Sequence, residues 1–187
     1  GRTLRGRTLG LYGYGRIGRA VAEYAHALGM SVQWWSSEDG RARAETDGAQ
    51  VAESRESFFS TSDVVSVHVR LKPSTRGIIT VNDLSLMRDR ALFVNTSRSG
   101  LVETGALETE VVKGRIMAAV DVFDAEPLND PDHPLLSRDN VLPTPHIGYV
   151  TEDEFDLQFA DIFEQVNAFA AGDPIHVINA AAISGRR

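Results

Sequence analysis

The chain has no cysteine among its 187 residues, and no apolar run approaches the length of a membrane span. The first absence excludes disulfides and thiolate metal sites and is typical of a cytoplasmic protein. A membrane-spanning helix needs roughly 20 consecutive apolar residues, so we expect no membrane contact. Positive charge is also scarce, with 19 Lys and Arg against 26 Asp and Glu. We therefore expect no nucleic-acid partner, because binding phosphates requires clustered cations.

What is present is the composition of a globular domain, with 42% hydrophobic and 24% charged residues. Short β-branched runs alternate with helical patterns. The predicted strands are 9–14, 31–35, 49–52, 64–69, 91–96, 116–122 and 140–144. The predicted helices are 16–28, 41–47, 54–60, 81–88, 103–113 and 151–171. This alternation predicts an α/β fold, a doubly wound and mostly parallel sheet with helices on both faces, in one domain that spans residues 1–187.

The first strand–helix junction carries the pattern Gly-x-Gly-x-x-Gly, at Gly13, Gly15 and Gly18. In a Rossmann-like site the first glycine permits a tight turn and the second lets backbone N–H groups approach a pyrophosphate. The third allows the helix to pack close to the strand. The alternative is an ordinary glycine turn, but the flanking strand and helix patterns favour a dinucleotide site. The cofactor contacts predicted here are Gly13, Tyr14, Gly15, Arg16, Ile17 and Gly18.

Three polar residues follow three different predicted strands, namely Arg98, Glu126 and His146. Ligands bind outside the carboxyl ends of the strands in open α/β sheets. Singly, these residues could be a surface charge, a turn residue and an ordinary loop histidine. Together they suit a 2-keto or 2-hydroxy acid, because a guanidinium binds a carboxylate and a histidine exchanges a proton. A glutamate bonded to the imidazole would set its tautomer.

The chain closely resembles the NAD(P)-binding domain of the D-isomer-specific 2-hydroxyacid dehydrogenases. The stretches that carry the resemblance follow the family's order over nearly the whole chain: Gly13–Gly18, Leu71–Gly77, Val94–Val102, Ala119–Leu128 and Pro143–Gly148. The resemblance implies an oxidoreductase that transfers a hydride between NAD(P) and a small D-2-hydroxy acid or 2-keto acid. Formate dehydrogenases, which are related, carry Gln where Glu126 stands, so the glutamate favours a hydroxyacid enzyme.

The resemblance also implies roles for single residues. Arg98 would bind the substrate carboxylate, His146 would act as acid and base, and Glu126 would be the partner of that histidine. The cofactor would contact Thr96, Arg98, Asp121, His146 and Gly148, with Asp121 at the nicotinamide carboxamide. The family also has a histidine where His68 stands. It would order the loop above the cofactor or simply pack at the strand end. No His, Asp and Glu cluster has metal-ligand spacing, so we expect no metal site.

The chain departs from the family after the second strand, where an acidic residue usually grips the adenosine ribose. Ser36 and Ser37 stand there instead, and we predict that they contact the cofactor. Arg41 and Arg43 are close enough in sequence to meet a 2′-phosphate, whereas Glu38–Asp39 could supply a carboxylate from a shifted turn. The sequence leaves NADP open, and the family's habit favours NAD.

The chain also begins almost at the glycine motif, so the family's upstream substrate segment is not among these residues. We expect the chain alone to bind dinucleotide but to turn over poorly. Helix 151–171 presents a phenylalanine-rich stripe that could pack on its own sheet, on another domain or on a second subunit. A homodimer is expected from the family. A competing function is an NAD(H)-sensing interaction module, similar to co-repressor relatives of the family, without turnover.

Overall fold

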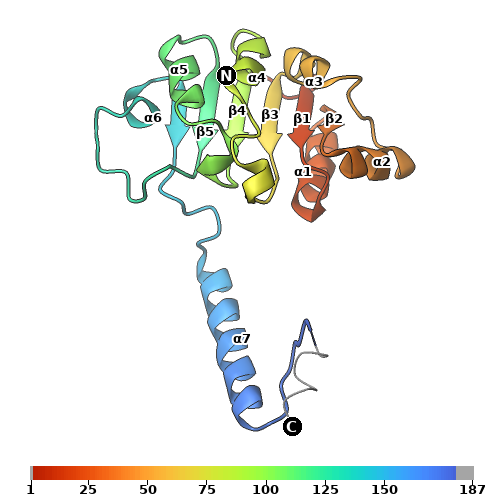
Figure 1. Ribbon diagram of the computed structural model, residues 1–187, viewed down its shortest axis with the longest axis vertical. Helices are drawn as coiled ribbons and strands as arrows, with labels where there is room; N and C mark the ends of the chain where they lie inside the picture. Colours follow the sequence, from red (N-terminus) through yellow and green to blue (C-terminus); the bar gives the residue numbers. More distant parts are fainter. Residues whose placement is uncertain (1, 180–187) are drawn as a thin grey trace. The chain divides into compact units, whose positions relative to one another are not determined.

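The computed structural model describes residues 2–179, and it contains a six-stranded parallel sheet with the order β2-β1-β3-β4-β5-β6 (Figure 1). The strands are β1 (Thr8–Tyr12), β2 (Ser31–Trp35), β3 (Val64–Val67), β4 (Leu92–Asn95), β5 (Met117–Val120) and β6 (Val141–Pro143). The order reverses between β1 and β3, which confirms the predicted doubly wound sheet. The reversal places the carboxyl ends of β1 and β3 beside the expected ligand crevice.

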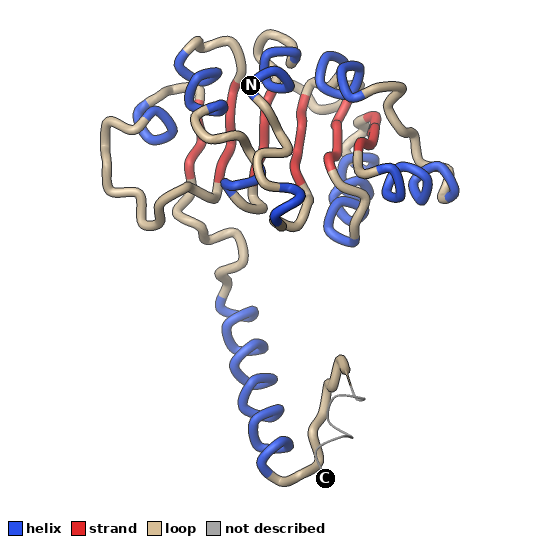
Figure 2. Tube along the Cα trace, in the orientation of Figure 1, coloured by secondary structure: helices blue, strands red, loops and turns tan. Residues whose placement is uncertain are grey.

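The helices follow the strands along the chain. They are α1 (Arg16–Ala27), α2 (Glu38–Thr46), α3 (Arg55–Thr61), α4 (Val81–Leu86), α5 (Ala106–Val112), α6 (Pro134–Ser137) and α7 (Glu152–Ala170), with short 3₁₀ turns η1 (Pro73–Thr75) and η2 (Ser99–Leu101). Figure 2 shows the strands side by side with helices around them. The short helix α6 was not predicted from the sequence.

Two buried clusters of apolar side chains form the core. Leu9 and Leu11 of β1 pack with residues of α1, whereas Tyr12 packs with Phe58 and Phe59 of α3. Side chains alternate between the faces of a strand, so the two clusters lie on opposite faces of the sheet. Burial on both faces explains why these strands are almost continuously apolar.

The predicted strand 49–52 is wrong, because Val51 forms only an isolated bridge to Trp34. Ala49 still donates to the Ala44 carbonyl at the end of α2, and Ser54 already caps α3. Too few residues remain between the two helices to extend a strand. Helix α2 also begins earlier than predicted, at Glu38, because the Ser37 side chain accepts from the Gly40 N–H.

The chain divides into two compact units, Gly1–His146 and Ile147–Arg187. The second unit contains α7, where the Thr151 side chain accepts from the Glu154 N–H and caps the helix. Within α7, the ring centroids of Phe155 and Phe159 are 4.4 Å apart, and these large side chains are exposed. That this stripe packs on the chain's own sheet, on another domain or on a second subunit stays a prediction. No helix in the described part of the chain is long and apolar enough to cross a membrane.

Candidate functional site

The glycine motif lies where the sequence predicts, between β1 and α1. Gly13 has φ +113°, and a Cβ there would lie 2.5 Å from the His68 carbonyl oxygen. A Cβ on Gly18 would lie 2.9 Å from the Gly13 carbonyl oxygen and 3.0 Å from the Trp34 ring. By contrast, a Cβ on Gly15 would meet nothing within 4 Å. The first and third glycines are therefore required by the fold, whereas the second faces open space.

That open space fits the pyrophosphate of a dinucleotide. Gly15 is the N-cap of α1, and no side-chain hydrogen bond from the described residues caps this helix. The N–H groups of the first turn are consequently available to an anion, and the helix dipole favours negative charge there. Tyr14 is buried, whereas Arg16 and Ile17 are exposed at the start of α1.

A pocket of about 450 Å³ adjoins this turn at the carboxyl edge of the sheet. It is lined by Ile17, His68, Val69, Arg70, Leu71, Thr96, Ser97 and Arg98. Three residues predicted to contact cofactor, Ile17, Thr96 and Arg98, thus share one cavity. Burial lowers the pKa of His68, and its Nε2 lies 3.0 Å from the Ser66 hydroxyl. His68 therefore contributes a neutral wall to this pocket.

The loop that carries Arg98 is held by a residue that the sequence interpretation missed. The buried Asn95 side chain donates to the Arg98 carbonyl at 2.9 Å and accepts from the Ser97 N–H at 3.0 Å. The Ser97 hydroxyl donates to the Val67 carbonyl at 2.8 Å, which ties the loop to β3. An asparagine at a strand end commonly forms such local turns, and this was the available signal. The exposed Arg98 side chain is therefore presented from a rigid loop.

Asp121 is buried directly after β5, and the Thr144 hydroxyl donates to its carboxylate at 2.6 Å. The Asp121 N–H donates to the Asn95 carbonyl at 3.1 Å. These bonds join the ends of β4, β5 and β6. The sequence analysis did not predict a role for Thr144. The one feature that could have indicated it is the position of Thr144 two residues before His146.

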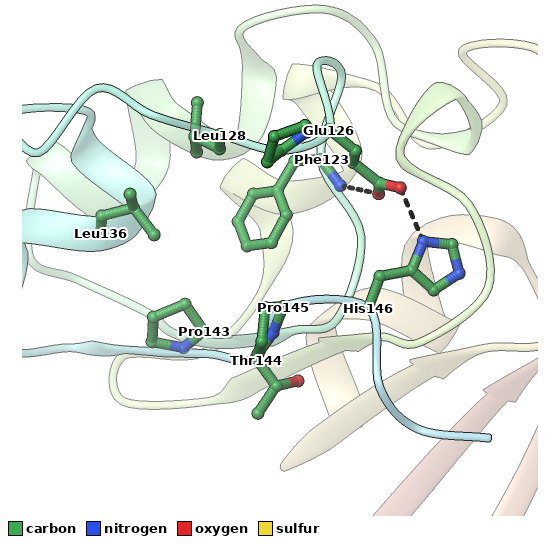
Figure 3. A pocket seen from close by; sticks show the side chains of 9 residues that line it. Phe123, Glu126, Leu128, Leu136, Pro143, Thr144, Pro145 and His146 are labelled. Atoms are coloured by element: carbon green, nitrogen blue, oxygen red, sulfur yellow. Dashed lines mark hydrogen bonds and ion pairs between the residues drawn. The ribbon is translucent and has the colours of Figure 1, made fainter. Parts of the chain in front are cut away.

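Glu126 and His146 come together from the loops that follow β5 and β6 (Figure 3). His146 Nδ1 lies 2.6 Å from Glu126 Oε2, and the Phe123 N–H donates to Glu126 Oε1 at 2.9 Å. The hydrogen bond with His146 is the largest cause that holds the pKa of Glu126 below its ordinary value, and the hydrogen bond from the Phe123 N–H is the second. An ionised carboxylate only accepts hydrogen bonds, so the proton of this bond belongs to His146 Nδ1.

The backbone at His146 contributes to this arrangement. Its φ is +56°, in the left-handed region that few non-glycine residues adopt, and its N–H donates to the Thr144 carbonyl at 3.0 Å. Such strained positions occur where the surrounding structure imposes a side-chain direction. Here the turn directs the imidazole toward Glu126.

An apolar pocket of about 220 Å³ adjoins the pair, as Figure 3 shows. Its walls are Phe123, Glu126, Pro127, Leu128, Leu136, Pro143, Thr144, Pro145 and His146. The pair itself is partly open to solvent, with 36% of the Glu126 side chain and 32% of the His146 side chain exposed.

The remaining predicted residues lie at the end of β2 and in the second unit. Ser37 caps α2, and the Ser36 hydroxyl accepts from the Tyr14 N–H at 3.5 Å. Gly148 belongs to the second unit, so its contact with cofactor stays a prediction. Among the described residues, no group of three His, Asp or Glu side chains is arranged to hold a metal ion.

Known proteins resemble this chain over most of its length. Residues 1–148 match the family model described as D-isomer specific 2-hydroxyacid dehydrogenase, NAD binding domain. A glyoxylate reductase from Aeropyrum pernix is 39% identical over 186 residues, covering 98% of this chain and 55% of the relative. A hydroxypyruvate reductase from Thermotoga maritima is 43% identical over 155 residues, covering 82% and 49%.

Solved structures give the same result. A phosphoglycerate oxidoreductase from Vibrio cholerae is similar with a TM-score of 0.85 and 46% identity, covering 92% of this chain and 55% of that one. The chain thus spans about half the length of the relatives that it matches. By sequence and by structure, the chain belongs to the D-isomer specific 2-hydroxyacid dehydrogenase family and contains its NAD binding domain.

Proposed function

We propose that this chain is the cofactor-binding part of an NAD(P)-dependent dehydrogenase that interconverts a small D-2-hydroxy acid and its 2-keto acid. The observation that carries the proposal is the 2.6 Å contact between His146 Nδ1 and Glu126 Oε2. It stands at the same sheet edge as Arg98 and the glycine turn. The related glyoxylate and hydroxypyruvate reductases are named for substrates of this class.

The chemistry follows from the side chains. When bound, nicotinamide supplies or accepts the hydride at C2 of the substrate. Arg98 binds the substrate carboxylate through its planar guanidinium, which matches two oxygens at once. His146 holds its Nδ1 proton toward Glu126, so Nε2 is the atom that gives a proton to the substrate oxygen during reduction and takes it back during oxidation.

Glu126 supports the histidine in two ways. Its carboxylate accepts from Nδ1, which fixes the imidazole tautomer, and the same hydrogen bond sets the ring orientation. Both effects require the carboxylate form, which the lowered pKa of Glu126 maintains. We infer that the buried Asp121 carboxylate, which accepts from the Thr144 hydroxyl, also accepts from the nicotinamide carboxamide.

The test is reduction of glyoxylate, hydroxypyruvate and phosphohydroxypyruvate with NADH and NADPH, measured by the loss of nicotinamide absorbance. Two proteins are compared, namely the 187-residue chain and the chain joined to a family substrate-binding segment. We expect binding but little turnover in the first and turnover in the second. His146→Ala should abolish reduction and retain cofactor binding, whereas a fully active variant contradicts the proposal. Cofactor binding without turnover of any 2-keto acid supports the sensing module instead.

We further propose that the protein acts in the cytoplasm as a homodimer, with the exposed stripe of α7 as the contact surface. Phe159 and Phe163 lie on this stripe, and their ring centroids are 6.4 Å apart. Replacing both with Asp should convert a dimer to a monomer in light-scattering measurements. Leu157, on the opposite side of α7, provides a matched Leu157→Asp control. An unchanged mass in the double variant contradicts this surface.

A further inference from the structure

We propose that the end of β2 is a subsite for the 2′-phosphate of the adenosine ribose, so that this chain binds NADP(H) more tightly than NAD(H). The inference rests on the proposed function, because it assumes a dinucleotide at the glycine turn. It goes further by assigning the cofactor, on the basis of Ser36, of Arg41 that contacts Ser36, and of two arginines that contact Tyr14 in the glycine turn.

Ser36 stands at the place where a ribose-binding carboxylate follows the second strand. Strand pairing sets Trp35 beside Tyr12, and the Gly13 N–H donates to the Trp35 carbonyl at 2.7 Å. The Ser36 hydroxyl then accepts from the Tyr14 N–H of the glycine turn. A hydroxyl carries no charge that would repel a phosphate, and it can donate a hydrogen bond to one.

The neighbouring carboxylates do not replace the missing one. Glu38 and Asp39 lie beyond the Ser37 cap, in the first turn of α2, and both are exposed. Gly40 packs directly against Ser36, because a Cβ on Gly40 would lie only 2.2 Å from the Ser36 hydroxyl oxygen. A shifted turn that brought Glu38 or Asp39 to the strand end would have to break this packing. The junction is therefore closely packed, and these two side chains extend from the helix rather than from the strand end.

Arg41 is held directly at the strand end. Its Nη1 donates to the Ser36 carbonyl at 2.7 Å, and its guanidinium lies 4.4 Å from the centroid of the Trp35 ring. Stacking and this hydrogen bond restrict the side chain before any ligand binds, so less conformational entropy is lost on binding. A guanidinium carries five N–H donors, and the contact with Ser36 uses one side of the fork.

Two more arginines border the same turn. The Arg43 Nη2 donates to the Tyr14 carbonyl at 3.4 Å, and the Arg19 guanidinium lies 5.8 Å from the Tyr14 ring centroid. The nearby Asp47 carboxylate accepts from the Tyr14 hydroxyl at 2.7 Å and lies 3.9 Å from Arg19. The Asp47 carboxylate is thus already engaged by the Tyr14 hydroxyl and by Arg19.

Glu38 and Asp39 reduce the net positive charge of this surface, but their side chains are exposed to solvent. Screening weakens their repulsion of a phosphate. Direct charge-assisted hydrogen bonds from arginine act at contact distance and are about twice as strong as neutral ones. Contact with Arg41 and Ser36 therefore decides the preference for NADP(H) over NAD(H).

The binding experiment uses minimal nucleotides and needs no turnover. Calorimetric titration of the 187-residue chain with 2′,5′-ADP and with 5′-AMP compares two ligands that differ only in the 2′-phosphate. We expect 2′,5′-ADP to bind at least about tenfold more tightly, the effect of one charge-assisted contact. NADPH and NADH should show the same order, and the difference should shrink as salt is raised.

Variants assign the effect to residues. Arg41→Met keeps an apolar contact with Trp35, and it should reduce 2′,5′-ADP affinity about tenfold while 5′-AMP affinity stays within about twofold. Ser36→Asp should reverse the preference, because a carboxylate accepts from the ribose hydroxyls and repels the phosphate. Arg138→Ala, an exposed arginine beyond α6, is the matched control and should change neither affinity.

Each outcome decides the inference. Equal or tighter binding of 5′-AMP overturns it and leaves the proposed function intact. Loss of 5′-AMP affinity in a Glu38→Gln, Asp39→Asn variant would show that these carboxylates hold the ribose, which also overturns it. If neither nucleotide binds to the folded chain, the inference and the proposed cofactor function both fail.

Discussion

His146 Nδ1 lies 2.6 Å from Glu126 Oε2, although 20 residues separate them in the sequence. The contact predicts that Glu126→Gln impairs proton transfer without disturbing cofactor binding. The variant is assayed in the chain joined to a family substrate-binding segment. There we expect kcat for 2-keto acid reduction to fall about 100-fold, within the range for general acid–base catalysis. NADH affinity should stay within about twofold, since Glu126 only supports the histidine.

The control for this variant is Asp124→Asn, which removes an exposed carboxylate from the same loop. It should leave kcat unchanged. A Glu126→Gln protein with ordinary kcat would show that the pair is structural.

Gly13 and Gly15 should respond differently to alanine. At Gly13 a Cβ meets the His68 carbonyl and φ is +113°, so Gly13→Ala should reduce the free energy of unfolding by more than about 2 kcal/mol. At Gly15 the Cβ enters open space, so Gly15→Ala should fold normally. Its nucleotide affinity should nevertheless fall at least about tenfold, because the methyl group fills the pyrophosphate cradle. Thermal unfolding and nucleotide titration of both variants give the comparison, and ordinary nucleotide affinity in Gly15→Ala would contradict the cradle.

Asn95 should act as a positioning residue for Arg98. Asn95→Ala removes the partners of the Ser97 N–H and the Arg98 carbonyl, and we expect a loss of about 1–3 kcal/mol in the free energy of unfolding. We also expect KM for the 2-keto acid to rise more than kcat falls, because the loop that presents the guanidinium loosens. Urea unfolding and steady-state kinetics measure the two effects. Asn82→Ala, on an exposed surface, is the control, and a KM that matches the control would contradict the positioning role.

Glu110 should make the stability of the fold depend on pH. Burial raises the pKa of Glu110, but hydrogen bonds from Lys113 and Arg115 outweigh it and leave the pKa below its ordinary value. The unfolded chain therefore binds this proton more readily, so the stabilisation is present above about pH 5 and is lost as pH falls through the folded-state pKa. Glu110→Gln should cost about 2 kcal/mol or more at pH 7 and less at pH 4.

Urea unfolding at the two pH values measures this difference. Glu45→Gln, which replaces an exposed carboxylate on α2, should be neutral at both. A cost for Glu110→Gln that is equal at pH 7 and pH 4 would contradict the ion-pair account.

Local pattern was enough to predict most elements of the fold. Continuous apolar runs predicted β3 and β4, and apolar residues at helical spacing predicted α1 and α7, because burial imposes these periods directly. The strand expected at 49–52 failed because its pairing depends on how much chain two neighbouring helix ends leave. Capping by Ser37 likewise moved the start of α2, since a side-chain hydrogen bond outweighed weak helical periodicity.

By itself, the sequence determined the type of fold, the glycine turn and the chemical identity of Arg98, Glu126 and His146, since residue type and the succession of strands and helices along the chain can be read locally. Only the tertiary structure decided which of them meet. The Glu126–His146 contact, the Asn95 support of the Arg98 loop and the Arg41 contact with Ser36 each join backbone or side chains at separate element ends. Such contacts depend on the register of parallel strands and the conformation of the turns that follow them, and no local pattern encodes the resulting distances.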